Sequence, residues 1–157
     1  MRGGSILVPG ESAGPIRIGM TLTGVEAVLG EPDERSEFEE DRMVYLSYFR
    51  LGLCVRIIEG TVEGVLLYSG RLGGHETMKW DRFEGAFDCG LDLDSNAKDV
   101  IEQLGPPEFS GRLPDAPIPS SWISYTSRGV GFDFIEATGE MIYITIFAPR
   151  PLPNDEQ

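Results

Sequence analysis

The chain contains two short stretches in which apolar residues recur at helical spacing. In the first, residues 21–30, Thr21 is a good N-cap, and one apolar stripe follows it: Leu22, Val25, Val28 and Leu29. Gly30 can adopt the left-handed conformation that ends a helix, and Pro32 prevents continuation. In the second, residues 94–107, we expect Asp94 or Ser95 to cap a helix that Gly105 ends. Its apolar side carries Ala97, Val100, Ile101 and Leu104.

Each expected helix is followed by three runs typical of β-strands. The first three runs are residues 42–49, 52–58 and 62–69, and the second three are 121–126, 129–135 and 140–147. Tight turns join several of these runs, so each set should form an antiparallel meander. The sequence therefore predicts an α+β fold of two tandem units, each a helix plus a three-stranded antiparallel meander, with the helices on one face of the sheet or sheets.

Matching residues indicate that the second unit is a duplicate of the first. Val25, Gly30, Tyr48, Gly52, Gly60 and Val65 correspond in order to Val100, Gly105, Tyr125, Gly129, Gly139 and Ile144. We divide the chain into an N-terminal extension (1–13), a first unit (14–70), a connector (71–81), a second unit (82–149) and a C-terminal tail (150–157).

Alternation along the strands assigns the side chains to two faces. We expect one face to pack beneath the helices: Leu46, Tyr48, Leu53, Val55, Ile57, Val65 and Leu67, with Ile123, Tyr125, Val130, Phe132, Phe134, Ile144 and Ile146. The other face, which includes Leu66 and Thr145, carries our candidate binding residues: Tyr45, Phe49, Arg56, Tyr68, Trp122, Asp133, Tyr143 and Phe147. Exposed Trp, Tyr and Arg on a rigid sheet commonly anchor protein interfaces. The alternative is that the termini, the Pro-rich loop between the second expected helix and Ser121, or a second copy of the chain cover this face.

The charge narrows the classes of partner. The 157 residues include 26 acidic and 13 basic ones, a formal charge of −13, so nucleic acids and anionic membranes would be repelled. A basic protein remains a compatible partner, although acidity can also serve solubility alone. No run is long enough to cross a bilayer, and the N-terminus lacks the apolar core of a signal peptide, which predicts a cytoplasmic protein, or a secreted or periplasmic one if a leader is removed.

The sequence predicts neither catalytic residues, nor a metal site, nor a cofactor. Cys54 and Cys89 are too few for a disulfide framework or a four-thiolate zinc site, and the single histidine, His75, has no obvious nucleophile near it in the chain. The stretch from Asp92 begins like a calcium loop, but Ala97 replaces the required glycine. These observations weigh against an enzyme.

The first unit resembles a family of envelope lipoproteins. Gly19, Met20 and Thr21, then Val25, then Leu29, Gly30 and Pro32, followed by an aromatic strand, match the motif of the SmpA/OmlA/BamE outer-membrane assembly lipoproteins. The doubled unit is similar to proteins of the β-lactamase inhibitory protein type, in which two such units grip a target enzyme with a concave sheet. The resemblance implies the fold more directly than the function, because the motif residues are structural.

Three functions are consistent with these observations. The leading hypothesis is a non-enzymatic module that binds a protein through the aromatic face, as an inhibitor or an immunity protein does. A second is a small-molecule carrier or enzyme with a pocket between the units, near Trp80 and His75. The third is an envelope-assembly or structural role by analogy with the SmpA/BamE-like lipoproteins.

Overall fold

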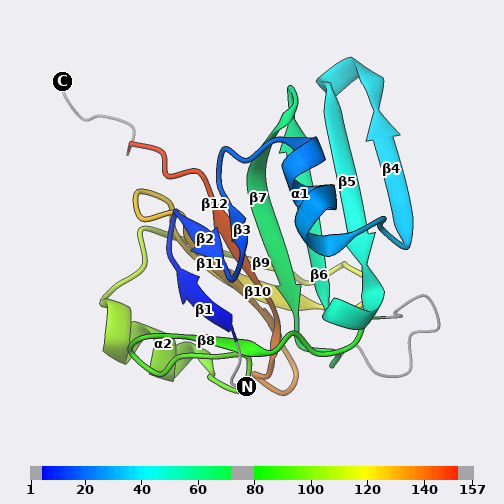
Figure 1. Ribbon diagram of the computed structural model, residues 1–157. Coiled ribbons are helices and arrows are strands. Elements are labelled where there is room, and N and C mark those ends of the chain that lie inside the picture. Colours follow the sequence, from blue (N-terminus) through cyan, green and yellow to red (C-terminus); the bar gives the residue numbers. More distant parts are fainter. Residues whose placement is uncertain (1–4, 72–79, 152–157) are drawn as a thin grey trace, which may run out of the picture.

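One large antiparallel sheet forms the framework of the protein (Figure 1). The computed structural model describes residues 5–71 and 80–151, and the eight strands of this sheet have the order β4-β5-β6-β7-β12-β11-β10-β9. Strands β4 to β7 are Glu34–Phe38, Met43–Tyr48, Leu53–Ile58 and Thr61–Tyr68, and β9 to β12 are Phe109–Leu113, Ser120–Tyr125, Val130–Ile135 and Met141–Phe147. The two halves of the chain meet where β7 pairs with β12, so the sheet is continuous through the molecule.

A second, smaller sheet lies against the large one. Its strands are β1 (Ser5–Val8), β2 (Ser12–Ala13), β3 (Ile16–Arg17) and β8 (Gly85–Phe87), in the order β3-β2-β1-β8. β1 is antiparallel to β2 and parallel to β8. In Figure 1 the strands β1 to β3 and the helix α1 lie in front of the large sheet. Leu7, Ala13 and Ile16 belong to the main hydrophobic core, so the small sheet covers part of that core.

Both helices are short, and their ends are capped in different ways. α1 (Leu22–Leu29) begins at Thr21, whose Oγ1 accepts a hydrogen bond from the backbone N–H of Gly24 at 3.0 Å, as predicted. α2 (Ala97–Leu104) does not begin at Asp94 or Ser95, so that prediction is wrong. Asn96 is the N-cap, because its side chain and that of Asp99 each accept from the other residue's backbone N–H.

The expected fold class is wrong. Instead of two helix-plus-meander units, the described residues form a mostly β molecule with twelve strands, two α-helices of 8 residues each and the 3-10 turns Glu39–Asp41 and Phe49–Leu51. Each half contributes four strands to one eight-stranded sheet, because β4 and β9 extend it at its two edges.

The main core lies between the large sheet and the layer of helices and small sheet. The inner-face residues predicted from alternation are all buried except Ile123, which is half-buried. Two tyrosines join this core to the helix ends. The Tyr48 hydroxyl donates to the carbonyl oxygen of Gly30 at 2.9 Å, and the Tyr125 hydroxyl donates to that of Gly105 at 2.8 Å. Both glycines have positive φ, as predicted.

Candidate functional site

Four side chains form a row on the outer face, by which we mean the side of the large sheet that points away from α1 and α2. Trp122 on β10 lies opposite Asp133 on β11, which lies opposite Tyr143 on β12, which lies opposite Tyr68 on β7. Residues directly opposite one another across antiparallel strands share a face and interact. All four are half-buried. The register therefore brings together four of the eight predicted site residues.

A second row crosses the outer face next to the first. Tyr45 on β5 lies opposite Arg56 on β6, and Gly64 on β7 lies opposite both Arg56 and Phe147 on β12. Phe147 is only 9% exposed, so it offers a partner little surface. The register shifts immediately after Arg56 in β6 and immediately after Asp133 in β11. Arg56 and Asp133 thus each adjoin a bulge, a feature that redirects side chains next to many functional sites.

Two glycines on the outer face make room for large neighbours. A Cβ atom at Gly111 would lie 2.6 Å from the indole of Trp122, and one at Gly64 would lie 2.8 Å from the guanidinium of Arg56. Both side chains therefore pack directly against backbone that has no Cβ. Neither glycine was singled out from the sequence, because a glycine's packing role depends on the residue opposite it.

One carboxylate forms ion pairs with two arginines at one end of the outer face. Glu63 accepts from Nε of Arg56 at 2.6 Å and from Nη2 of Arg150 at 3.2 Å. The side chains of Arg56 and Glu63 are only 22% and 17% exposed, so this pair is partly shielded from solvent. Arg56 also hydrogen-bonds to Tyr45. The positive charge at this end is consequently in part compensated.

Asp133 has a different environment. Burial raises its pKa to about 6, and a hydrogen bond with Tyr143 partly opposes that shift. Burial and the neighbouring carboxylate raise the pKa of Tyr143 to about 12, so this phenol remains a hydrogen-bond donor at neutral pH. Among the ion pairs of residues 5–71 and 80–151, none involves Asp133. It is a half-buried carboxylate whose charge has no close cation in the described chain.

Trp80 covers one end of the first row. Its ring stacks on Tyr68 with 4.1 Å between the ring centroids and an interplanar angle of 12°, and it meets Phe49 edge-on at 4.7 Å. Burial raises the pKa of Tyr68. At this end the connector therefore covers part of the face, a possibility that we did not consider among the termini, the Pro-rich loop and a second copy of the chain. His75, which we considered together with Trp80, lies outside the described residues.

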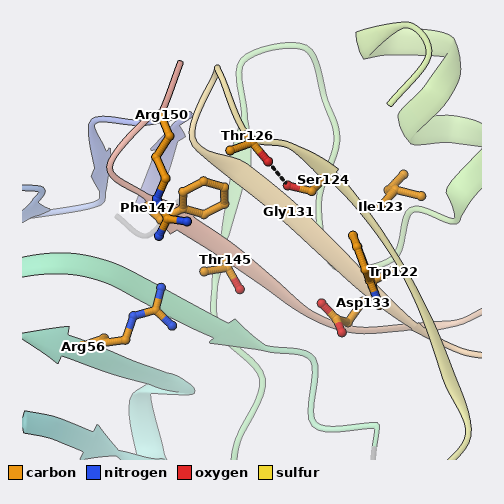
Figure 2. A pocket seen from close by; sticks show the side chains of 10 residues that line it. All are labelled: Arg56, Trp122, Ile123, Ser124, Thr126, Gly131, Asp133, Thr145, Phe147 and Arg150. Carbon is orange, nitrogen blue, oxygen red and sulfur yellow. Dashed lines mark hydrogen bonds between the residues drawn. The ribbon is translucent and has the colours of Figure 1, made fainter. Parts of the chain in front are cut away.

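A depression of about 270 Å³ lies on the outer face, next to Asp133. Figure 2 shows the side chains that line it. Its lining includes four of the predicted site residues, namely Arg56, Trp122, Asp133 and Phe147. The other four, Tyr45, Phe49, Tyr68 and Tyr143, lie outside it. The remaining lining residues are Ile123, Ser124, Thr126, Gly131, Thr145 and Arg150. Alternation placed Thr145 on this face, but no sequence signal pointed to Arg150, which follows the last strand.

Other reactive groups do not gather into a site in the described structure. In residues 5–71 and 80–151, no three His, Cys, Asp or Glu side chains are placed to hold a metal ion. Cys54 is buried, and burial raises the pKa of its thiol to about 11, which keeps it in the unreactive protonated form. Neither of the helices described has the length and apolar character needed to cross a bilayer.

Comparison with known proteins gives one partial match to a family and one structural similarity. Residues 7–56, less than half of the chain, are similar to the outer membrane protein assembly factor BamE domain. The fold has a TM-score of 0.49 to an extracellular protein containing a SCP domain from Bacillus anthracis str. Ames, at 11% sequence identity. That similarity covers 83% of this chain and 43% of the other, so this chain spans less than half of that protein. No curated protein matches the chain.

Proposed function

We propose that this chain is a non-enzymatic protein-binding module of the cell envelope, which takes part in assembling a multi-protein complex through its outer face. The observation that carries this proposal is the row of Trp122, Asp133, Tyr143 and Tyr68 across the centre of a continuous sheet. Trp, Tyr and Arg are the residue types most often found to dominate binding energy at interfaces. A rigid sheet presents them with little loss of conformational entropy on binding.

The partial family match supports the envelope-assembly alternative over the inhibitor or immunity reading. The matching domain is described as an assembly factor for outer membrane proteins, and the matched residues 7–56 include Tyr45, Phe49 and Arg56 of the candidate surface. The same match favours an envelope location over a cytoplasmic one. Nothing in the comparisons resembles an enzyme inhibitor.

No specific observation favours the small-molecule alternative. The depression of about 270 Å³ lies below the roughly 300–1,000 Å³ typical of ligand pockets. It also lies on the face of the sheet, and of its lining residues only Arg56 comes from the first unit.

Chemical cross-linking and affinity capture from the envelope fraction of the source organism test this function. Wild-type protein should retain a partner that the double variant Trp122→Ala, Tyr143→Ala loses. The matched control is Ile101→Ala, which changes an exposed apolar residue of α2 and should leave capture unchanged. Circular dichroism must show that all three proteins are folded. If the double variant captures the same proteins as the wild type, the outer face is not the binding surface.

A further inference from the structure

The geometry points to a subsite on the outer face for one basic side chain, a lysine or an arginine, of a partner polypeptide, with Asp133 as its counter-ion and Trp122 beside it. This inference rests on the proposed function and specifies the chemistry of the partner. Figure 2 shows Trp122 and Asp133 together at one end of the depression, with Arg56 and Arg150 at the other.

Asp133 is suited to bind a cation because residues 5–71 and 80–151 form no ion pair with it. It is half-buried, and within the described residues it forms a hydrogen bond with Tyr143. A carboxylate that has lost part of its hydration gains more from an incoming ammonium or guanidinium group than a fully hydrated one. At neutral pH it is mostly ionised, since its pKa is about 6.

The neighbours of Asp133 fit the rest of a basic side chain. Trp122 and Tyr143 lie on either side of it across β10 and β12. Aromatic rings attract cations and also pack against the methylene stem of lysine or arginine. Ser124 and Thr145 line the same depression and offer hydroxyl acceptors.

The two arginines that line the depression do not make it an equally good site for an anion, because both are already paired. Glu63 already binds both Arg56 and Arg150, at 2.6 and 3.2 Å. An acidic ligand would have to compete with this carboxylate, whereas a basic side chain at Asp133 competes with no cation of the described chain. The overall charge of −13 also attracts basic partners and speeds their encounter.

Titration of isotope-labelled protein with short capped peptides tests the subsite. The probes are acetyl-Gly-X-Gly-amide with X as lysine, arginine, norleucine or glutamate, and the readout is the NMR signal of the Trp122 indole N–H, assigned with Trp122→Phe. We expect saturable shifts with the lysine and arginine peptides at low ionic strength. Binding should weaken about tenfold or more in Asp133→Asn, which keeps the shape of the side chain.

The matched control is Glu102→Gln, which also removes one negative charge but lies exposed on α2, so peptide affinity should stay as in the wild type. The inference would be overturned if the norleucine peptide bound as tightly as the lysine and arginine peptides, or if the glutamate peptide bound more tightly than they do. It would also be overturned if neither basic peptide gave a saturable shift up to about 20 mM. Capture of the protein partner distinguishes a failure of the cation subsite from a failure of the proposed binding face. If Asp133→Asn retains a partner that Trp122→Ala, Tyr143→Ala loses, the outer face binds proteins and only the cation subsite is wrong.

Discussion

At the scale of single residues, the shape of the outer face depends on glycines as much as on aromatics. Trp122 and Arg56 can pack onto the sheet only because Gly111 and Gly64 lack a Cβ atom. Alternation predicted from the sequence that Trp122, Asp133, Tyr143 and Tyr68 share a face. It could not show that they are direct neighbours, because cross-strand neighbours depend on register, and bulges after Arg56 and Asp133 shift that register.

Asp133 should lower the stability of the protein at neutral pH. Its folded pKa of about 6 exceeds the value of 3.8 for an unperturbed Asp, so the folded state binds more protons between these two pH values. The free energy of unfolding therefore falls as the pH rises through this window. Asp133→Asn removes the effect, and we expect it to be more stable than the wild type by about 1–2 kcal/mol at pH 7, after allowance for partial exposure.

Urea unfolding at pH 3.5 and pH 7 measures this difference. The advantage of Asp133→Asn should be smallest at pH 3.5, where the wild-type side chain is also neutral. Comparing the two proteins at each pH cancels the contributions of the other carboxylates. A variant that is less stable than the wild type at pH 7 would show that the Asp133 carboxylate is satisfied in the fold and needs no external cation.

Truncation of Trp122 should affect binding more than folding. Trp122 is half-buried on the outer face, whereas Phe132 on the neighbouring strand is 0% exposed on the inner face. Phe132→Ala should cost about 3–5 kcal/mol because it leaves a cavity in the core. Trp122→Ala should cost about 1 kcal/mol, since much of the lost volume is filled by water. Thermal unfolding of both variants gives the comparison, and an equal loss in the two would mean that the outer face is core.

At the scale of elements, the sequence predicted the strands that have one buried face and missed the strands that have no buried residue. The six inner strands were found because their residues alternate between the core and the outer face. β4 and β9 have no buried residue, so their sequences carry no such alternation. The N-cap of α2 was misplaced because Asp94, Ser95 and Asn96 are all good caps, and only the reciprocal bonds with Asp99 distinguish Asn96.

The tyrosines that reach the helix ends should stabilise α1 and α2. Tyr125 is 1% exposed, and its hydroxyl donates to the carbonyl oxygen of Gly105, beyond the last turn of α2. Tyr125→Phe removes this donor without changing the packing of the ring, and we expect a loss of about 1–2 kcal/mol. Tyr48→Phe should behave similarly at α1, because its hydroxyl donates to Gly30. Urea unfolding measures both losses. Values near zero would mean that water replaces these bonds.

At the scale of the whole molecule, the sequence left open whether the two halves share one sheet or form two. It did not reveal that β4 and β9 are the edge strands and that β7 and β12 pair at the centre. β7 and β12 are far apart in the chain, and their pairing of Tyr68 with Tyr143 and Val65 with Ile146 is a tertiary contact. The family resemblance indicated the elements of the first half, but the small sheet could not be foreseen. Its strands are only 2–4 residues long, too short for a periodic signal.

The shared sheet predicts that the two halves unfold together. Val65, Leu67, Ile144 and Ile146 are all 0% exposed where β7 meets β12, so the core has no break at this seam. The two tryptophans report on different halves, since Trp80 stacks on Tyr68 of β7 and Trp122 lies on β10. In the single-tryptophan variants Trp122→Phe and Trp80→Phe, fluorescence should therefore give coincident urea transitions. Adding Phe132→Ala, a change in the second half, should lower both midpoints equally. A Trp80 transition that stays in place while the Trp122 transition moves would show that each half folds as a separate unit.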